Sequence, residues 1–203
     1  MRRILSHHRY EQLKALAADF IEDYALCYPL DTFETAAVLG LHVAVHVGGL
    51  PPAAPFCSTD DGYTVALLSA HGPKYQIHLN GVKPLLRQRF TLMHEISHVW
   101  LGHLHNDGLV DDHQQEAEAN FFASYLLAPD QLVLAWVPEL TVAGIAEKFQ
   151  VSREAARLIH GRVLRMLNTG ARRRDYDRRI ASAGAQRVRR ADASSAPEIE
   201  GSA

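Results

Sequence analysis

Apolar and polar positions at the start of the chain follow first a helical and then a strand-like period. Over residues 10–26, apolar side chains recur every three or four positions with charged ones between them, which predicts an amphipathic helix. A short helix is expected over residues 33–39, because Asp31 or Thr32 can cap its start and Gly40 stands where a helix commonly stops. Residues 41–47 then alternate between apolar and polar side chains, as a half-buried strand does.

The middle of the chain predicts a small sheet followed by a long helix. Residues 64–69 and 75–79 have the composition of strands, and residues 71–74 between them form a hairpin-like break. Together with the earlier strand they are expected to make a small antiparallel sheet of about three strands. Pro84 fits the first turn of the helix that follows, which is expected to run through His98.

The second half of the chain is predicted to be helical before it ends in a polar tail. The pattern favours helices over residues 114–127, 130–137, 141–149 and 152–167, the last two arranged like a helix-turn-helix pair. Residues 171–203 show no apolar periodicity and are rich first in arginine and then in serine, alanine and glutamate, so this tail is expected to be disordered. Strands followed by helices indicate the α+β class.

Composition, charge and cysteine content indicate the cellular compartment. Of the 203 residues, 47% are apolar and 22% are charged, which is typical of a soluble globular protein. Residues 1–170 carry 13 basic and 18 acidic side chains, whereas residues 171–203 carry eight arginines and five acids. Cys27 and Cys57 are expected to be free, buried thiols, as in a reducing compartment. No run approaches the roughly 18 apolar residues of a membrane span and no signal-peptide core is present, so we expect a cytoplasmic protein without a membrane partner.

The chemically informative side chains are concentrated in the segment His94-Glu95-Ile96-Ser97-His98. Residues four apart on a helix lie on one face, about 5–6 Å apart at Cβ, so His94 and His98 can bind a single metal ion. Neutral imidazoles suit zinc, and a catalytic zinc takes three protein ligands and leaves a fourth position for water. Glu95 lies further round the helix but can reach such a water, which is the His-Glu-x-x-His pattern of zinc peptidases.

A third metal ligand must come from the residues that follow, and the candidates are His103, His105, His113, Glu116 and Glu118. A ligand at His103 would give a spacing that lacks the glycine and the extra residue of the metzincin motif. Glu116 and Glu118 lie about 200° apart on one helix, so at most one of them can face the metal. Glu116 shares its face with Asn120, which could accept a hydrogen bond from a ligand histidine, whereas Glu118 shares its face with Phe122. Glu116 is therefore the expected third ligand.

Two segments of the chain together resemble a known family. Residues 89–98 are Arg-Phe-Thr-Leu-Met-His-Glu-Ile-Ser-His, and residues 116–129 are Glu-Ala-Glu-Ala-Asn-Phe-Phe-Ala-Ser-Tyr-Leu-Leu-Ala-Pro. They closely resemble the ImmA/IrrE family of zinc metallopeptidases, whose motifs are Arg-Phe-Thr-Leu-x-His-Glu-x-x-His and Glu-x-x-Ala-Asn-x-Phe-Ala-x-x-Leu-Leu-x-Pro. The likeness covers roughly residues 10–165 and continues in residues 145–157, where Gln150 replaces a glycine usual in the family. A non-glycine residue in the left-handed conformation at a helix C-terminus costs about 1 kcal/mol. The turn at Gln150 is therefore expected either to pay this cost or to adopt another conformation.

The resemblance implies a site, an activity and a substrate. It makes Glu95 the catalytic base, in agreement with the spacing argument. It also implies one zinc ion per chain, held by His94, His98 and Glu116. The implied substrate is narrow: a helix-turn-helix transcriptional repressor, cleaved to relieve repression during a stress response or the induction of a prophage or mobile element. Because zincin-like sites often bind substrate as an added strand, residues 64–69 or 75–79 are expected to hold the cleaved segment.

The expected organisation has three parts. Residues 1–140 form a zincin-like metallopeptidase domain with a small antiparallel sheet and two active-site helices. Residues 141–168 form a helix-turn-helix-like region packed on that domain, and residues 171–203 form the basic tail. A donor that stabilises the transition state is left unassigned among His105, His113 and Tyr125.

Two other functions stay open on the sequence. The first is a metal-binding, DNA-binding transcriptional regulator without proteolytic activity, read from the helix pair over residues 141–167 and from Arg153, Arg157 and Arg162. The basic tail could add weak, non-specific contact with nucleic acid. The second is a zinc hydrolase that acts on small amides rather than on proteins.

Overall fold

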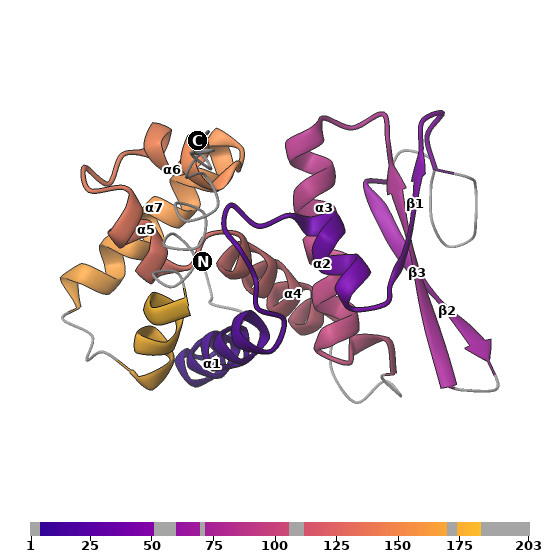
Figure 1. The fold of residues 1–203 in the computed structure, drawn as a ribbon, viewed down its shortest axis with the longest axis horizontal. Helices are drawn as coiled ribbons and strands as arrows, with labels where there is room; N and C mark the ends of the chain where they lie inside the picture. The colour runs from indigo at the N-terminus through magenta and orange to yellow at the C-terminus, as the bar shows by residue number, and fades with distance from the viewer. Residues whose placement is uncertain (1–4, 51–59, 70–71, 106–111, 170–173, 184–203) are drawn as a thin grey trace, which may run out of the picture.

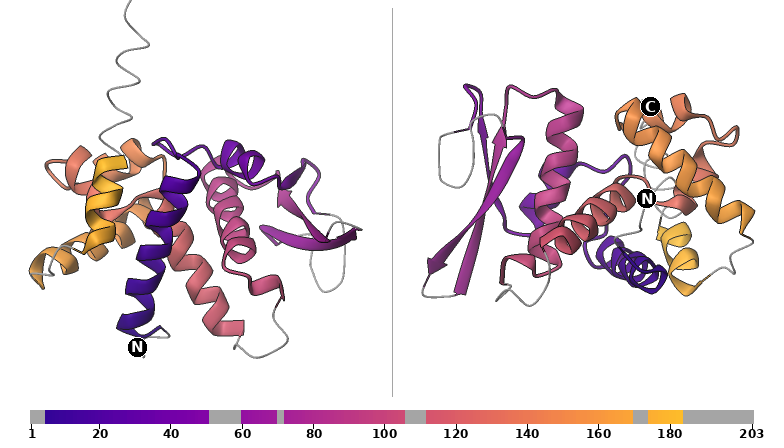
Figure 2. Two further views of the ribbon diagram at one scale, coloured as in Figure 1. Left: turned by 60° about the horizontal axis from the view of Figure 1, so that its bottom comes forward. Right: turned by 180° about the vertical axis from the view of Figure 1, so that it is seen from behind.

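The computed structural model describes residues 5–50, 60–69, 72–105, 112–169 and 174–183. A three-stranded sheet lies at one side of the molecule, and the helices follow it in successive layers (Figure 1). α3 (Leu85–Trp100) packs on the sheet, α4 (Asp112–Leu127) packs on α3, and α1 (His7–Asp23) packs on α4. The remaining helices of the second half lie on the side away from the sheet, as the view from behind also shows (Figure 2). The expected α+β class is confirmed.

The first two helices begin at the residues that can cap them. The hydroxyl of Ser6 accepts a hydrogen bond from a first-turn backbone N–H of α1 (3.1 Å). α2 (Thr32–Val38) begins after Asp31, whose carboxylate accepts from two backbone N–H groups of the first turn (2.9 and 3.0 Å). Such caps stabilise a helix by about 1 kcal/mol each. Both predicted helices are therefore confirmed.

The sheet is mixed, which corrects the expectation of an antiparallel one. β2 (Gly62–Ser69) and β3 (Gly72–Asn80) form the predicted antiparallel hairpin, but β1 (His42–His46) pairs with β3 in parallel, in the order β1-β3-β2. β1 and β2 run in opposite directions, and β3 lies between them. Periodicity identifies the residues of a strand but not the edge of the sheet that the strand joins.

The long helix α3 is fixed on the sheet by its apolar face. Leu92 and Ile96 of α3 and Ile77 and Leu79 of β3 are all buried in one hydrophobic core. Pro84 is the residue immediately before the helix rather than in its first turn, and its fixed φ and missing N–H also suit this position. The polar face of α3 is thereby turned away from this part of the core.

The predicted helix pair near the C-terminal end is present. α6 (Val142–Phe149) and α7 (Arg153–Asn168) pack against each other, and α7 also packs on α5 (Asp130–Trp136). Gln150 adopts the left-handed conformation between α6 and α7 (φ 52°, ψ 51°), so the turn has kept the glycine geometry rather than rearranged. Arg89 of α3 donates to the carbonyl of Gln150 (3.1 Å), which helps to offset the cost of about 1 kcal/mol.

Part of the tail is folded, which corrects the expectation of disorder for residues 171–203. Residues 175–183 form a helix, called here the C-terminal helix, in which Tyr176 and Ile180 are buried. Arg179 forms ion pairs with Asp19 and Glu22 of α1, and the two helices lie side by side in both views of Figure 2. Burial of two large side chains and this pairing explain the order. Residues 184–203 lie outside the described part of the chain.

The cysteines and the helices bear on the expected compartment. Cys27 is a free thiol, as expected, but it is exposed rather than buried, and Cys57 lies outside the described residues. Among the helices that the structure describes, none combines the length and the apolar character needed to cross a membrane.

Candidate metal centre

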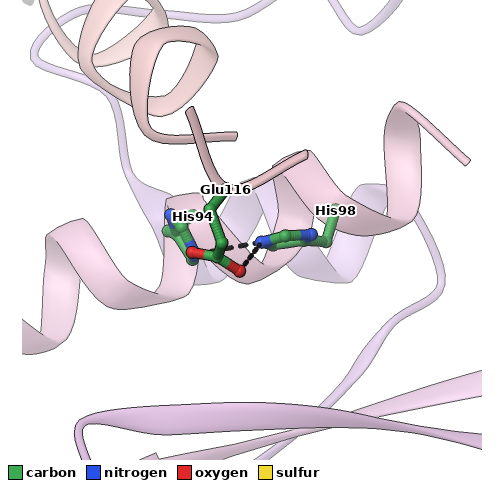
Figure 3. A group of neighbouring side chains, drawn as sticks. All are labelled: His94, His98 and Glu116. Atoms are coloured by element: carbon green, nitrogen blue, oxygen red, sulfur yellow. Dashed lines mark hydrogen bonds and ion pairs between the residues drawn. The ribbon is translucent and has the colours of Figure 1, made fainter. Parts of the chain in front are cut away.

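Three side chains from two helices converge on one point. His94 and His98 lie one turn apart on α3, with their Nε2 atoms 3.0 Å apart. Glu116, from the first half of α4, places Oε2 3.4 Å from His94 Nε2 and Oε1 3.2 Å from His98 Nε2 (Figure 3). One ligand atom from each of these residues lies within 4.8 Å of the others. The three side chains expected to bind the metal therefore lie together in the structure.

The packing of the two helices explains this convergence. Leu92, Met93 and Ile96 occupy the buried face of α3, so the two histidines are left on the face that meets α4. On α4 the small residues Ala119 and Ala123 are fully buried and allow the helices to pack closely. Because Glu116 precedes them by one and two turns, its carboxylate reaches the histidines from the open end of the contact.

The three groups fit a metal cation. Burial, reinforced by the neighbouring charge of His94, lowers the pKa of His98 to about 4, so the imidazole is neutral at neutral pH. A neutral imidazole facing the metal position offers a lone pair at Nε2, and the Glu116 carboxylate offers only acceptor atoms. Three acceptors within van der Waals contact repel one another unless a cation lies between them. Two imidazoles and one carboxylate are also a ligand set known for catalytic zinc.

Glu95 lies beside this cluster and is held by a strand. It is largely buried, and Thr64 Oγ1 of β2 donates to Glu95 Oε2 (2.7 Å). Burial raises the pKa of Glu95, and the Thr64 hydrogen bond opposes but does not cancel that effect. A carboxylate with a raised pKa is better matched to proton transfer near neutral pH. The sequence alone does not indicate Thr64, because this contact depends on how β2 is placed against α3.

A cleft of about 260 Å³ opens at the metal centre and includes Glu95 among its lining residues. One wall is polar, where Asp61 accepts hydrogen bonds from Arg87 at the start of α3. Phe90 gives the cleft an apolar surface. The remaining lining residues are Gly62, Thr91, His94, Glu116 and Asn120.

Three of the other candidate ligands, Glu118, His103 and His113, are not members of the three-residue cluster. Glu118 is buried and pairs with Arg9 of α1. His103 lies behind His98, with 3.1 Å between their Nδ1 atoms. His113 is exposed at the start of α4, and the side chain of His105 lies outside the described part of the chain.

The role expected for Asn120 is wrong. Its amide nitrogen donates to the backbone carbonyl of Glu116, one turn earlier on α4 (2.8 Å), instead of its oxygen accepting from a ligand histidine. For a side chain as short as asparagine, a hydrogen bond to its own helix backbone competes with one to a histidine on the neighbouring helix. Tyr125, an unassigned candidate for transition-state stabilisation, is fully buried and donates to Gln131 (2.9 Å), and it does not line the cleft.

Comparison with known proteins supports the chemistry of this centre. The model of one protein family, Peptidase_M78, described as the IrrE N-terminal-like domain, matches residues 56–158, half of the chain. The matched segment runs from before β2 into α7 and contains the metal cluster and Glu95. Among curated proteins, none matches the chain. The chain belongs to the Peptidase_M78 family of metallopeptidases, the IrrE N-terminal-like domains, and thus to the ImmA/IrrE group that its motifs resemble.

Proposed function

We propose that this protein is a zinc-dependent endopeptidase. His94, His98 and Glu116 hold one zinc ion per chain, and Glu95 is the catalytic base. The observation that carries this proposal is the convergence of three ligand atoms within 4.8 Å at a cleft that a buried carboxylate also lines. Metallopeptidase family membership supports the same reaction class.

The side chains have separate roles in this reaction. A zinc ion, when bound, supplies a Lewis acid that polarises the scissile carbonyl and increases the acidity of water. Glu95 accepts the proton of the attacking water and then delivers it to the leaving amine. Thr64 holds one oxygen of Glu95, which leaves the other oxygen for the water. Burial of Glu95 keeps bulk solvent away from the proton in transit.

The substrate is proposed to bind as an extended strand along β2. Two strands were expected to hold the substrate, and β3 is excluded because it is the central strand with both edges paired. β2 has one edge without a described strand partner and carries Thr64, whose hydroxyl contacts Glu95. A peptide added at that edge therefore passes the base.

The protein partner is proposed to be a helix-turn-helix repressor whose cleavage relieves repression in a stress response or in the induction of a prophage or mobile element. This part of the proposal rests on the ImmA/IrrE resemblance. A repressor substrate also places the reaction in the cytoplasm.

Of the three arginines expected to recognise DNA, Arg153 and Arg157 are exposed on α7, but Arg162 is not available. Arg162, one of the expected recognition residues, is engaged in an ion pair with the buried Asp130. In the C-terminal helix, Arg179 is paired with α1, and just before that helix Arg174 is paired with Glu11. Such arginines are poorly placed to bind phosphates.

The test is cleavage of a co-expressed repressor by wild-type protein and by Glu95→Gln, followed by mass analysis of the fragments. Glu95→Gln keeps the shape of the side chain but removes the base, so zinc content is expected to be unchanged and cleavage to fall to background. Glu147→Gln, an exposed position on α6, is the matched control and is expected to cleave normally. Equal cleavage by zinc-loaded Glu95→Gln would contradict the assignment.

A further inference from the structure

Behind the metal centre, a second histidine contacts one of the ligand histidines. His98 and His103 meet edge to face, with ring centroids 5.0 Å apart and Nδ1 atoms 3.1 Å apart. His103 belongs to η1 (His103–His105), the short 3-10 helix that follows α3. Because Nε2 of His98 faces Glu116 and His94, the Nδ1 contact lies on the side of the ring away from the metal position.

The direction of this hydrogen bond follows from the orientation of the His98 ring, whose Nε2 faces the metal position. An imidazole that presents a lone pair at Nε2 carries its proton at Nδ1. His98 therefore donates from Nδ1–H, and His103 accepts at its own Nδ1. A neutral His103 that accepts at Nδ1 must carry its proton at Nε2, which lies 3.4 Å from Glu118 Oε2.

Glu118 is fixed at the far end of this chain of contacts. Only 2% of it is exposed, and it accepts hydrogen bonds from the guanidinium of Arg9 and from the Gln114 amide (2.8 Å). The bond from Arg9 Nε is 2.8 Å long. Arg9 belongs to α1, before the matched family segment. A buried carboxylate paired in this way is a rigid acceptor for the His103 N–H.

We propose that His103 is a positioning residue that holds His98 in the tautomer and orientation needed for metal binding, and that Glu118 and Arg9 hold His103 in turn. The inference rests on the proposed metal site. His94 provides the contrast within the same centre, because its buried Nδ1 has no hydrogen-bond partner among the described residues. His98 is thus the ligand that the fold orients before metal arrives, and loss of His103 weakens metal binding without removing a ligand.

The test measures the zinc dissociation constant by competition with a chromophoric chelator. His103→Leu removes the acceptor and is expected to weaken zinc binding about 10–100-fold, as loss of a partner to a ligand histidine does. His103→Asn retains an acceptor oxygen near the Nδ1 position and is expected to bind within about threefold of wild type. His8→Leu, an exposed position on α1, is the control for general effects of histidine loss and is expected to bind normally.

The tautomer of His98 provides a readout that simple destabilisation does not move. Nitrogen–proton correlation spectra of the zinc-loaded wild type should show His98 protonated at Nδ1, with that proton shielded from exchange. In His103→Leu the same proton should exchange with water much faster. Glu118→Gln gives a second test that does not depend on the folding of His103→Leu, and it is expected to weaken zinc binding about tenfold.

Each outcome separates this inference from the proposed function. A wild-type protein that binds no zinc would overturn both. A wild type that binds zinc, together with a folded His103→Leu or Glu118→Gln that binds it equally well, would overturn the positioning role alone. A His103→Asn protein as weak as His103→Leu would also contradict it, because an acceptor at that position would then make no difference.

Discussion

Arg162 is expected to be essential for stability, because its loss would leave a buried charge without a partner. Its guanidinium donates to Asp130 Oδ1 (2.6 Å), to Ser124 Oγ (3.1 Å) and to the carbonyl of Ala128 (2.6 Å), and it lies over the ring of Tyr125. Asp130 is 0% exposed, and its Oδ2 has no partner among the described residues. The carboxylate therefore depends on one arginine.

The expected cost of Arg162→Met follows from these contacts. Removing one member of a buried ion pair destabilises a protein by about 3–5 kcal/mol. Asp130 lies in the first turn of α5, where the helix dipole stabilises a negative charge by about 0.3–1 kcal/mol, so the lower end of the range, about 3 kcal/mol, is expected. Of a total stability of about 5–15 kcal/mol, this is a large share, and for a chain of this size it lowers the Tm by about 6–12 °C.

Urea unfolding followed by tryptophan fluorescence measures this effect. Arg157→Met, an exposed arginine on the same helix, is the matched control and is expected to change the free energy of unfolding by less than about 0.5 kcal/mol. The double variant Asp130→Asn/Arg162→Met removes the buried charge as well and should recover part of the loss. If Arg162→Met unfolds at the same urea concentration as Arg157→Met, the buried pair is not stabilising and the argument fails.

Three further predictions concern the site and the C-terminal helix. Thr64→Val removes a hydrogen bond that lowers the pKa of Glu95, so the acid limb of the kcat/KM profile should move to higher pH. Activity near neutral pH should fall about fivefold. An unchanged profile would exclude this contact from the mechanism. Zinc at a free concentration of 100 times Kd should raise the free energy of unfolding by about 2.7 kcal/mol, and chelation should reverse this. If zinc stabilises His98→Ala equally, the metal binds elsewhere. Burial alone would raise the pKa of Glu11, but the hydrogen bond from Tyr176 and the charge of Lys14 outweigh it and lower that pKa. The stabilisation by Glu11 is therefore present above its usual pKa of 4.5 and lost as pH falls through the lower pKa of the folded state. Glu11→Gln should therefore make the free energy of unfolding less dependent on pH on the acid side. Parallel curves for wild type and variant would refute this.

The metal centre could be predicted because its geometry is local. His94 and His98 are brought together by the helix period alone, and the angle between Glu116 and Glu118 on one helix allows only one of them to face the metal. Glu116 was preferred for a contact of Asn120 with a ligand histidine, which the structure does not contain. The helices themselves were predictable from their periodicity and caps, as Ser6 and Asp31 illustrate.

The features that sequence reasoning missed depend on tertiary contacts. Nothing in the pattern of β1 indicates that it pairs with β3 in parallel, and nothing near Thr64 indicates that its hydroxyl reaches α3. The role given to Asn120 belongs in the structure to His103, whose partner Glu118 is anchored by a residue from the first helix. No periodicity connects such distant segments.

The C-terminal helix was missed for a different reason. Tyr176, Ile180 and Ala183 recur with helical spacing, and the first two are buried while Ala183 packs against the core. The arginines between them dominate the composition of the segment and favoured a prediction of disorder. This short amphipathic pattern becomes stable by burying Tyr176 and Ile180 against the core, with the ion pairs of Arg179 beside them, and composition reveals neither contact.

The bond between Arg9 and Glu118 joins residues 109 positions apart, and this has a consequence for the order in which the protein assembles. During synthesis, α1 and the two histidines of α3 are made before α4, so neither Glu116 nor the acceptor for Arg9 exists when the histidines first emerge. Contacts of such long range form slowly, because the loop between their ends must close first. If the proposed site binds zinc, metal acquisition is expected to be a late event in folding, after α1 and α4 have met. A nascent chain that ends before α4 is then expected to hold zinc weakly through two imidazoles.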